Sequence, residues 1–348
     1  MFRILSLMVL LLAAQAKDEK PVAEFIETTP ETQKAADRGL AFLAKQQARN
    51  GSWGGNVPVA VSSVAGLAFL AGGHVPGRGE YGENVKRAVD FILRCASRSG
   101  YISEGGSGHG GSSRMHGHGY ATLFLAEVYG MTQNIPGVET TELKETLKRA
   151  VKLIENCQDP NGGWSYEPQP SGHEGSVTVT QIHALRAARN AGIRVNSEVI
   201  KKAIDYIRRS TNPDGTVNYS LGGGQRSSFA LTSAGVCVLL YLGLHADENV
   251  KKGLQALFDY REGKGGGDYS SGSYYYYANF YAAIAMFHAG GEDWKRWYPT
   301  IRDDLLKKQE TDGSFGGSES QSYGAAFGTA FACIILQIPS RYLPTLQR

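Results

Sequence analysis

The sequence predicts an all-α fold, an α6/α6 toroid in which six helical hairpins form two concentric helix rings. Three observations support this fold class. A short glycine-rich turn recurs six times, the segment before each turn has one apolar face, and the segment after it is apolar on nearly all sides. A helix with one apolar face lies outside a core, whereas a helix that is apolar all round must be buried. Closure into rings is therefore expected, because an open solenoid would leave one face of each inner helix in water.

The recurring turn is clearest at residues 156–164, which read NCQDPNGGW. Pro160 and the Gly162-Gly163 pair end the preceding helix, since proline lacks an N–H donor and glycine adopts positive φ at little cost. Trp164 then supplies a large ring that can pack over the turn. Similar turns end at the anchor residues Trp53, Tyr101, Val217, Tyr269 and Phe315. Successive anchors are 46 to 63 residues apart, which indicates six repeats.

Each repeat is expected to contain an amphipathic outer helix followed by a buried inner helix. In the third repeat, one helical face carries Leu143, Leu147, Ala150, Val151 and Ile154. The clearest outer helices are predicted at 142–157, 198–209, 248–260 and 294–309. The inner helices are predicted at 62–70, 120–129, 179–191, 229–244, 277–289 and 325–338. None of these runs is long enough to span a membrane.

The first residues have the pattern of an export signal. Arg3 is followed by an apolar run, and Ala14-Gln15-Ala16 matches an A-x-A cleavage site. We expect a signal peptide at 1–16, a linker at 17–31, a single toroid of six repeats at 32–338 and a C-terminal tail at 339–348. Cleavage would place the protein in the periplasm or outside the cell, and a retained N-terminal anchor is the alternative. No transmembrane helix is expected after cleavage.

Composition narrows the partners and the redox chemistry. The net charge is +3 and the basic residues are scattered along the chain, so no nucleic-acid partner is expected. Cys95 and Cys157 end equivalent helices of neighbouring repeats. Such helices pack about 8–10 Å apart, which is wide for a disulfide. Four free thiols are therefore expected, although export would permit disulfides.

Topology indicates where function lies. Alternating helices run up and down, so the loops from outer to inner helices all emerge at one end of the barrel. These loops are also the long ones, at 104–117, 167–176, 221–228, 263–276 and 316–323. The inner helices point their free N–H groups at this end, where they favour anions and polar acceptors. Function is therefore expected at the loop-rich end.

Histidines concentrate in the second and third of these loops. The candidate catalytic residues are His116, His118, His173 and Glu174. The candidate zinc ligands are His109, His116, His118 and His173. His118 stands where the second loop becomes an inner helix, so we expect its imidazole to face the ring mouth. Structural capping by this loop is the alternative, since the histidine spacing matches no metal motif.

Further residues are candidate ligand contacts. Arg114 and Arg226 are loop cations that can pair with an anionic ligand or be solvated at the surface. Tyr274 and Tyr277 open the fifth inner helix, where aromatic rings can stabilise a cation, bind a sugar face or fill core. At most two tyrosines of that run can face a cavity, because successive side chains radiate around a helix. His183 lies in an apolar inner segment and is expected to be a core histidine.

The turn sequences resemble a known repeat. Gln47…Gly51-Ser52-Trp53, Gln158…Gly162-Gly163-Trp164 and Gln309…Gly313-Ser314-Phe315 are similar to the QW-type repeats of squalene and oxidosqualene cyclases. Those enzymes share an α/α toroid with the β-subunits of protein prenyltransferases. The segments at 118–131 and 176–193 also resemble exported bacterial proteins described by their prenyltransferase/squalene-oxidase repeats. The likeness covers 32–338 and implies a central cavity for a small apolar, isoprenoid-like molecule.

The catalytic motifs of those enzymes do not carry over. The D-x-D-D acid of hopene-type cyclases has its nearest match at 301–304, where Ile301 occupies the first position on an outer helix. The D-C-T-A-E segment of oxidosqualene cyclases and the thioester G-C-G-E-Q of complement-type toroids are absent. Protein prenyltransferases hold zinc through a D-x-C pair, whereas Cys157 has Glu155 two residues before it. The resemblance therefore implies the fold but leaves the chemistry open, and no cofactor is predicted.

Three functions remain open from the sequence. The chain is a toroid that binds or processes an apolar ligand, a non-catalytic exported binding or scaffold module for a protein or glycan, or a polysaccharide-active toroid. A deep aromatic pocket with carboxylates would favour an enzyme. A cavity filled by Ala, Phe and Leu side chains would favour a scaffold.

Overall fold

The computed structural model describes residues 28–104, 114–222, 226–264 and 274–347. Within these ranges the chain forms thirteen α-helices and two short 3₁₀-helices, with isolated β-bridges but no strand. The predicted all-α class is therefore confirmed. In the same ranges, no helix is both long enough and apolar enough to cross a membrane.

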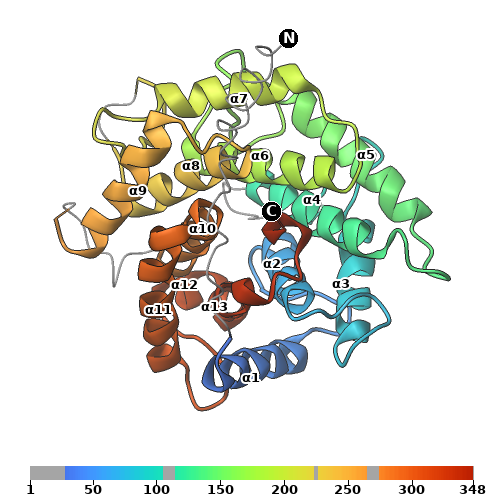
Figure 1. Ribbon diagram of the computed structural model, residues 1–348. Coiled ribbons are helices and arrows are strands. Elements are labelled where there is room, and N and C mark those ends of the chain that lie inside the picture. The colour runs from blue at the N-terminus through green and yellow to red at the C-terminus, as the bar shows by residue number, and fades with distance from the viewer. Residues whose placement is uncertain (1–27, 105–113, 223–225, 265–273, 348) are drawn as a thin grey trace, which may run out of the picture.

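All but one of the α-helices belong to two concentric rings (Figure 1). The outer ring contains α1 (Pro30–Gln46), α3 (Gly82–Arg94), α5 (Thr141–Asn156), α7 (Ser197–Arg209), α9 (Glu248–Arg261) and α11 (Gly291–Lys308). The inner ring contains α2 (Pro58–Ala71), α4 (Arg114–Thr132), α6 (Gly175–Asn190), α8 (Phe229–Tyr241), α10 (Tyr275–Ala289) and α13 (Ala325–Gln337). The remaining elements are the short helix α12 (Ser318–Tyr323) and the 3₁₀-helices η1 (Ile338–Ser340) and η2 (Pro344–Leu346).

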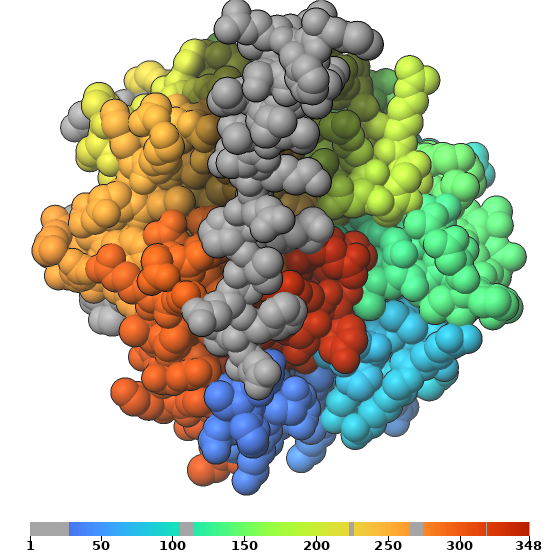
Figure 2. Space-filling view, viewed as in Figure 1, coloured from blue at the N-terminus to red at the C-terminus, as the bar shows by residue number. Residues whose placement is uncertain are grey.

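The rings are closed. Each inner helix packs against the inner helices on both sides of it, and α13 packs against α1 and α2 at the start of the chain. In Figure 2 the sectors follow one another around the molecule in chain order, so that α1 (blue) lies beside α11 (orange). The predicted α6/α6 toroid is thereby confirmed, and the open solenoid is excluded.

The two rings have the predicted faces. In α7 the buried residues form one stripe: Val199, Ala203, Tyr206 and Ile207. In α8 every residue is buried except Ala230 and Leu231, which line the cavity described below. The outer helices therefore contribute one face to the core, while the inner helices lie inside it.

In three of the turns a glutamine ties the turn to the next repeat. The side-chain amide of Gln158 donates to the carbonyl of Gly162 in its own turn (3.0 Å) and to the carbonyl of Val199 in α7 (2.9 Å). Gln47 and Gln309 donate in the same way, to Gly51 and Asn84 and to Gly313 and Ala35 respectively. One amide thus holds the turn of one hairpin against the outer helix of the next. In the last repeat the same amide joins the turn to α1.

Close packing requires glycine in this turn. Gly162 has φ +95°, and a Cβ here would lie 2.2 Å from the carbonyl oxygen of Lys202 in α7. Four other turns have a glycine at the same point, with φ between +89° and +92°: Gly51, Gly100, Gly215 and Gly313. A Cβ on any of them would collide with the backbone of the next outer helix. Each of these turns therefore lies directly on the neighbouring helix, at a distance that a side chain would not allow.

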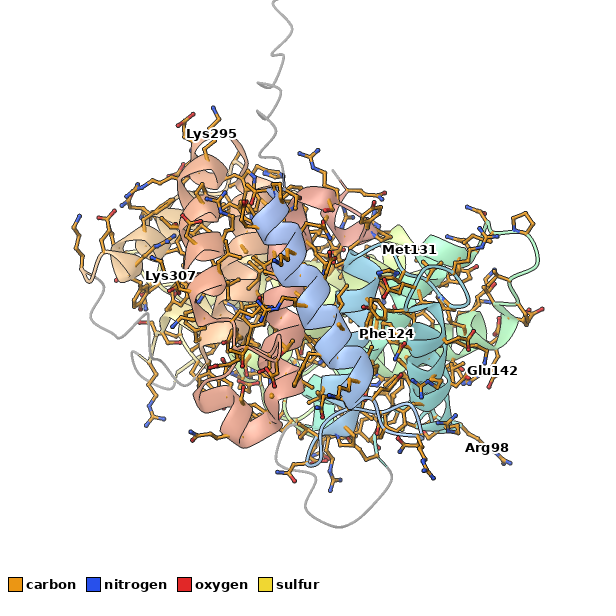
Figure 3. All side chains as sticks on the ribbon, turned by 90° about the horizontal axis from the view of Figure 1, so that it is seen from below. Arg98, Phe124, Met131, Glu142, Lys295 and Lys307 are labelled. Atoms are coloured by element: carbon orange, nitrogen blue, oxygen red, sulfur yellow. The ribbon has the colours of Figure 1, made fainter. Side chains whose placement is uncertain are left out.

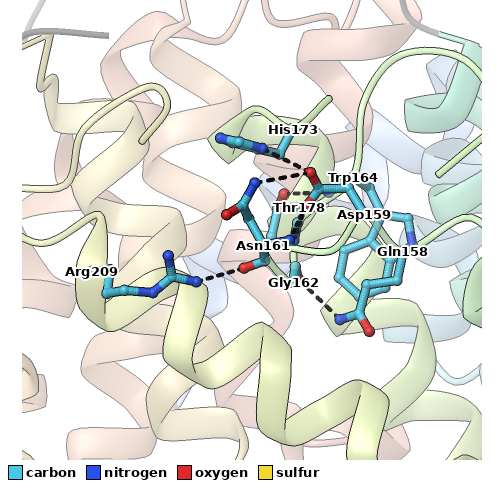
Figure 4. A network of polar contacts seen from close by, with 9 residues as sticks. Gln158, Asp159, Asn161, Gly162, Trp164, His173, Thr178 and Arg209 are labelled. Atoms are coloured by element: carbon cyan, nitrogen blue, oxygen red, sulfur yellow. Dashed lines mark hydrogen bonds and ion pairs between the residues drawn. The ribbon is translucent and has the colours of Figure 1, made fainter. Parts of the chain in front are cut away.

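The anchor residue joins the turn to its own helices. The backbone N–H of Trp164 donates to Thr178 Oγ1 in α6 (3.0 Å; Figure 4), and its indole N–H donates to the carbonyl of Ile154 in α5 (2.8 Å). The backbone N–H groups of other anchors donate to inner-helix hydroxyls in the same way, in the pairs Trp53 and Ser62, Val217 and Thr232, and Phe315 and Thr329. The rings of Trp53 and Trp164 are buried, so both tryptophans have the predicted structural role.

In the second repeat the anchor is Ile102, and the prediction of Tyr101 was wrong. Ile102 follows the turn glycine Gly100 by two residues, which is the spacing of the other described anchors. It pairs in an isolated bridge with Ala96, six residues back, as two other anchors do with their own partners. Ile102 is fully buried, whereas Tyr101 is half-buried. The fifth anchor, Tyr269, lies outside the described residues.

The turns gather at one end of the barrel. Figure 3 views the molecule from the side, with Arg98, in the turn after α3, at the lower end. Met131, near the end of α4, and Lys295, near the start of α11, lie toward the opposite end. The inner helices therefore begin at the lower end, as their alternation with the outer helices predicted.

The four cysteines all fall within the described ranges and are unpaired thiols, as expected. Cys95 is half-buried, and the other three are buried. Burial raises the pKa of the Cys95 and Cys157 thiols to about 11, so both are protonated near neutral pH.

The contact at the turn glycine predicts a difference between two alanine variants. Gly162 and Gly192 both have positive φ (+95° and +86°), but a Cβ at Gly192 would meet no atom of the described residues within 4 Å. Gly192→Ala should lower the free energy of unfolding by about 1–2 kcal/mol, the strain of a left-handed alanine. Gly162→Ala should add about 1–3 kcal/mol of overpacking to that strain. Chemical denaturation measures both, and equal losses would contradict the packing of the turn on α7.

Candidate functional site

A cavity of about 320 Å³ opens at the end of the barrel where the inner helices begin. All six inner helices contribute to its lining from their first two turns or from the residue that precedes them. Tyrosine is the most frequent lining residue, as Tyr120, Tyr166, Tyr219, Tyr274, Tyr277 and Tyr323. The cavity therefore lies at the loop-rich end, where the sequence predicted function.

The tyrosines supply both ring faces and hydroxyl groups. The hydroxyls of Tyr166 and Tyr219, from two different loops, hydrogen-bond to each other. The hydroxyl of Tyr277 is buried and has no hydrogen-bond partner among the described residues. Burial raises the pKa of Tyr277 and of Tyr120, so both phenols are neutral and keep a proton to donate.

Stacked aromatic rings close the cavity on the side that faces the interior of the barrel. Phe327 packs edge-on against Phe331, with ring centroids 4.9 Å apart, and Phe331 lies at the same distance from Phe280. Phe280 in turn contacts His183 (6.1 Å), which is buried and is the core histidine that the sequence predicted. The barrel is therefore filled along its axis, and the cavity is confined to one end.

Three carboxylates cap inner helices around this end. They are Glu104 on α2, Glu174 on α6 and Glu319 on α10, and each accepts a hydrogen bond from a backbone N–H in the first turn, at 2.9, 3.0 and 2.6 Å. An anion at a helix N-terminus satisfies free N–H groups and interacts favourably with the helix dipole. Burial raises the pKa of Glu174, and it raises the pKa of Glu319 to about 7.

Sequence reasoning identified Glu174 as a candidate but missed Glu104 and Glu319. Glu104 lies in a loop and Glu319 in the short helix α12, and each caps a helix of the preceding hairpin, so their partners are 45 and 43 residues away. The usual sequence signal of a cap is a residue immediately before its own helix. These two glutamates could have been found only by aligning the loops of successive repeats.

Four of the predicted candidates line the cavity: Arg114, His116, Tyr274 and Tyr277. Arg114 lies at the exposed rim, and Tyr274 is 56% exposed. His116 Nε2 hydrogen-bonds to Ser176 Oγ (3.0 Å), and the Ser176 hydroxyl donates to the carboxylate of Glu174 (2.8 Å). Burial lowers the pKa of His116 to about 4, so its imidazole is neutral near pH 7. The structure thus joins His116 to Glu174 through one serine.

His118 does not face the mouth, so that expectation was wrong. α4 begins at Arg114, ahead of the predicted start, which places His118 in the second turn of the helix. The imidazole is fully buried: Nδ1 accepts a hydrogen bond from the N–H of Ile102 (3.2 Å), and Nε2 donates to the carbonyl of Ala150 (3.3 Å). His118 therefore accepts the hydrogen bond from the backbone N–H of the anchor Ile102, which a serine or threonine hydroxyl of the inner helix accepts in other repeats.

Two other candidates lie away from the cavity lining. His173 Nδ1 is 3.1 Å from Asp159 Oδ2, inside the third turn (Figure 4). Its ring is edge-on to Tyr206. Arg226 is exposed, and its backbone carbonyl accepts a hydrogen bond from Tyr219 N–H (3.1 Å). The structure therefore does not assemble His116, His118 and His173 into one site, because each has a different partner.

The predicted zinc ligands include His109, which lies outside the described residues. In the part of the chain that the structure describes, no three His, Cys, Asp or Glu side chains are placed to hold a metal ion.

The buried His118 predicts that the effect of His118→Gln depends on pH. Burial lowers the pKa of His118 from 6.5 to about 4 in the folded protein. As the pH falls, the imidazole is therefore protonated in the unfolded chain at a higher pH than in the folded chain, and this favours unfolding. The contribution of His118 to stability is complete above pH 6.5 and is lost as the pH falls toward 4. The stability difference between wild type and His118→Gln should therefore shrink over that range, by up to about 1.4 kcal/mol per pH unit. Urea denaturation at several pH values measures it, and a constant difference would contradict the burial of a neutral ring.

Comparison with known proteins places the chain in a family. The family model described as the prenyltransferase alpha-alpha toroid domain matches residues 1–200 and 179–340. No curated protein sequence matches the chain.

Solved structures share the fold at low sequence identity. The type II terpene cyclase MstE from Scytonema, in its apo form, has a TM-score of 0.60 and 14% identity, with 90% of this chain and 99% of that chain covered. An inactive variant of the alpha-1,6-mannanase of Salegentibacter sp., in complex with alpha-1,6-mannotriose, has a TM-score of 0.63 and 9% identity, with 91% and 100% covered. A toroid fold supports different chemistries, so these likenesses extend to the fold alone. By its sequence and its fold, the chain belongs to the prenyltransferase alpha-alpha toroid domain family.

Proposed function

We propose that this toroid binds one small molecule with an apolar body and an oxygen-bearing end in the cavity at the start of the inner helices. The observation that carries the proposal is the buried hydroxyl of Tyr277, which has no hydrogen-bond partner among the described residues, in a tyrosine-lined cavity of about 320 Å³. Small-molecule sites occupy roughly 300–1,000 Å³, so a compact ligand fits. A buried donor without a partner costs about 1–3 kcal/mol, which a ligand oxygen would relieve.

An acceptor on the wall complements this donor. The Ser176 hydroxyl has one proton, and it donates that proton to Glu174. In the hydrogen bond between Ser176 and His116, the donor is therefore the N–H at His116 Nε2. Nδ1 of the neutral His116 is then a hydrogen-bond acceptor, and it has no partner within the described ranges. A ligand hydroxyl can donate to such a nitrogen and can accept from a phenol such as Tyr277. The wall therefore favours a hydroxyl at the polar end of the ligand.

An isoprenoid alcohol or a prenylated phenol matches this description. A variant of MstE, to which this chain is similar in fold, binds geranylgeranyl dihydroxybenzoate, a molecule with an apolar chain and oxygen-bearing groups. The floor of Phe327 and Phe331 limits the chain length that the cavity can hold. We therefore favour a short isoprenoid.

A glycan is the second candidate. Exposed tyrosine rings such as Tyr274 can stack on a sugar face, and the similar mannanase binds alpha-1,6-mannotriose. Of the described residues that line the cavity, Glu104 is the one carboxylate, and it accepts a hydrogen bond from the N–H of Val59. We therefore propose that the cavity binds a ligand, and we propose no catalytic reaction. A scaffold that binds neither class of molecule is the remaining alternative.

Export belongs to the proposal as well, on the signal-like sequence at 1–16, which lies outside the described residues. The N-terminus of the mature protein tests this directly. We expect it to be Lys17, and an N-terminus at Met1 would contradict export by cleavage.

Isothermal titration of the full chain with two probes, farnesol and alpha-1,6-mannotriose, tests the binding proposal. Tyr277→Phe removes one hydroxyl and keeps the ring, so it should weaken binding of the preferred probe about tenfold, which corresponds to roughly 1.4 kcal/mol. Tyr206→Phe is the matched control, because it removes the hydroxyl of a buried tyrosine outside the cavity lining. Preference for farnesol supports the isoprenoid, and preference for mannotriose supports the glycan. Binding of neither probe, or equal effects of the two variants, would contradict the proposal.

A further inference from the structure

The barrel end opposite the cavity is closed by the chain's own C-terminal segment, residues 341–347. In Figure 1 this end faces the viewer, and the C-terminus lies at the centre of the inner ring. Within the segment, η2 packs against α4, α6 and α10, and Leu343, Thr345 and Leu346 are buried. The segment therefore occupies the axis of the barrel.

Three inner helices bind one residue of this segment, Thr345. Its backbone N–H donates to Glu127 Oε2 in α4 (3.2 Å). Its hydroxyl hydrogen-bonds to His183 Nε2 in α6 (3.2 Å), and its carbonyl accepts from His288 Nε2 in α10 (3.1 Å). All three side chains are buried. Every polar group of Thr345 is thus paired with a different helix, as in a binding site that recognises one residue of a ligand.

The apolar residues of the segment are also packed against the barrel. The ring of Pro344 lies against α4 at Gly130, where a Cβ would be 3.4 Å from Pro344 Cγ. Leu343 and Leu346 flank Thr345 and are almost completely covered. This end of the barrel therefore fits a short peptide with a threonine between apolar residues.

The helix ring is complete without the segment. α13 ends at Gln337 and packs on α1, α2 and α10 by itself. The segment begins with Arg341, which has a left-handed φ of +55°, and Tyr342, which is 52% exposed. Buried polar groups are costly without partners, and Thr345 supplies the hydrogen bond that Glu127 makes. The polar residues of this end are therefore explained by the segment rather than by ring closure.

We propose that this end of the barrel is a peptide-binding site, which the chain fills in cis with the segment Leu343-Pro344-Thr345-Leu346. The ligand class is a short peptide of apolar residues around one threonine, recognised through its N–H, hydroxyl and carbonyl groups. The site is separate from the cavity at the other end, because the Phe331 and Phe280 rings fill the axis between them. Its existence does not rest on the small-molecule proposal.

The test converts the segment into a free ligand within the intact protein. A recognition sequence for a site-specific protease is inserted between Ser340 and Arg341 and is cleaved after folding. We expect the cleaved protein to keep its helical circular dichroism and to exchange its bound peptide for a fluorescent synthetic copy of residues 341–348. Thr345→Val in the synthetic peptide, which removes the hydroxyl that contacts His183, should weaken binding about tenfold. Gln347→Ala is the matched control, because this side chain is exposed and should not affect binding.

Each other outcome would overturn the proposal. Loss of helical structure on cleavage would show that the segment is an integral part of the core. A labelled peptide that does not exchange, or that binds equally well with Thr345→Val, would show that there is no site for Thr345. In the uncleaved chain, Thr345→Val should accelerate amide hydrogen exchange in residues 341–347 but not in the inner helices. Uniform acceleration over the barrel would contradict a separable ligand.

Discussion

The contact between each glycine turn and the next outer helix determines how the other elements are placed. At residues 158–164, Gly162 lies against the backbone of α7, the Gln158 amide bonds to the same helix, and Trp164 bonds to α5 and α6. One turn therefore joins three helices of two repeats. The last turn makes equivalent contacts with α1 through Gln309 and Gly313, so the rule that joins neighbours also closes the ring. An isolated hairpin lacks these partners. The stability of the fold therefore depends on the contacts between neighbouring repeats.

Closure by these turns makes the two ends of the barrel chemically different. The turns hold all six inner-helix N-termini at one end, where free N–H groups attract the capping glutamates and polar side chains surround a cavity. Aromatic rings fill the barrel axis between the cavity and the other end, so the cavity does not extend through the barrel. At the far end the inner helices finish, and the chain's own Thr345 pairs with buried polar side chains of three of them. This polarity is the basis on which we propose two different binding sites on one scaffold.

The sequence predicted the ring but only part of the site. Helical period and turn spacing are local signals that repeat six times, so the helices, their faces and the closure could be predicted. Tyr277 and His116 could be found because they stand at the start of inner helices. His118 was misplaced because α4 begins earlier than the glycine-rich loop suggests. The additional turn of helix places His118 in the core instead of at the mouth of the cavity. Glu104 and Glu319 were missed because their partners belong to neighbouring hairpins.

A crystal structure of the full chain would show whether the ligand site lies where the turns gather. The crystals are grown with farnesol or with alpha-1,6-mannotriose, according to which of them binds in solution. We expect ligand density in the cavity between Tyr120, Tyr277 and Phe327, with a ligand oxygen within about 3 Å of the Tyr277 hydroxyl. Density at another site, or an empty cavity in crystals of saturated protein, would contradict it.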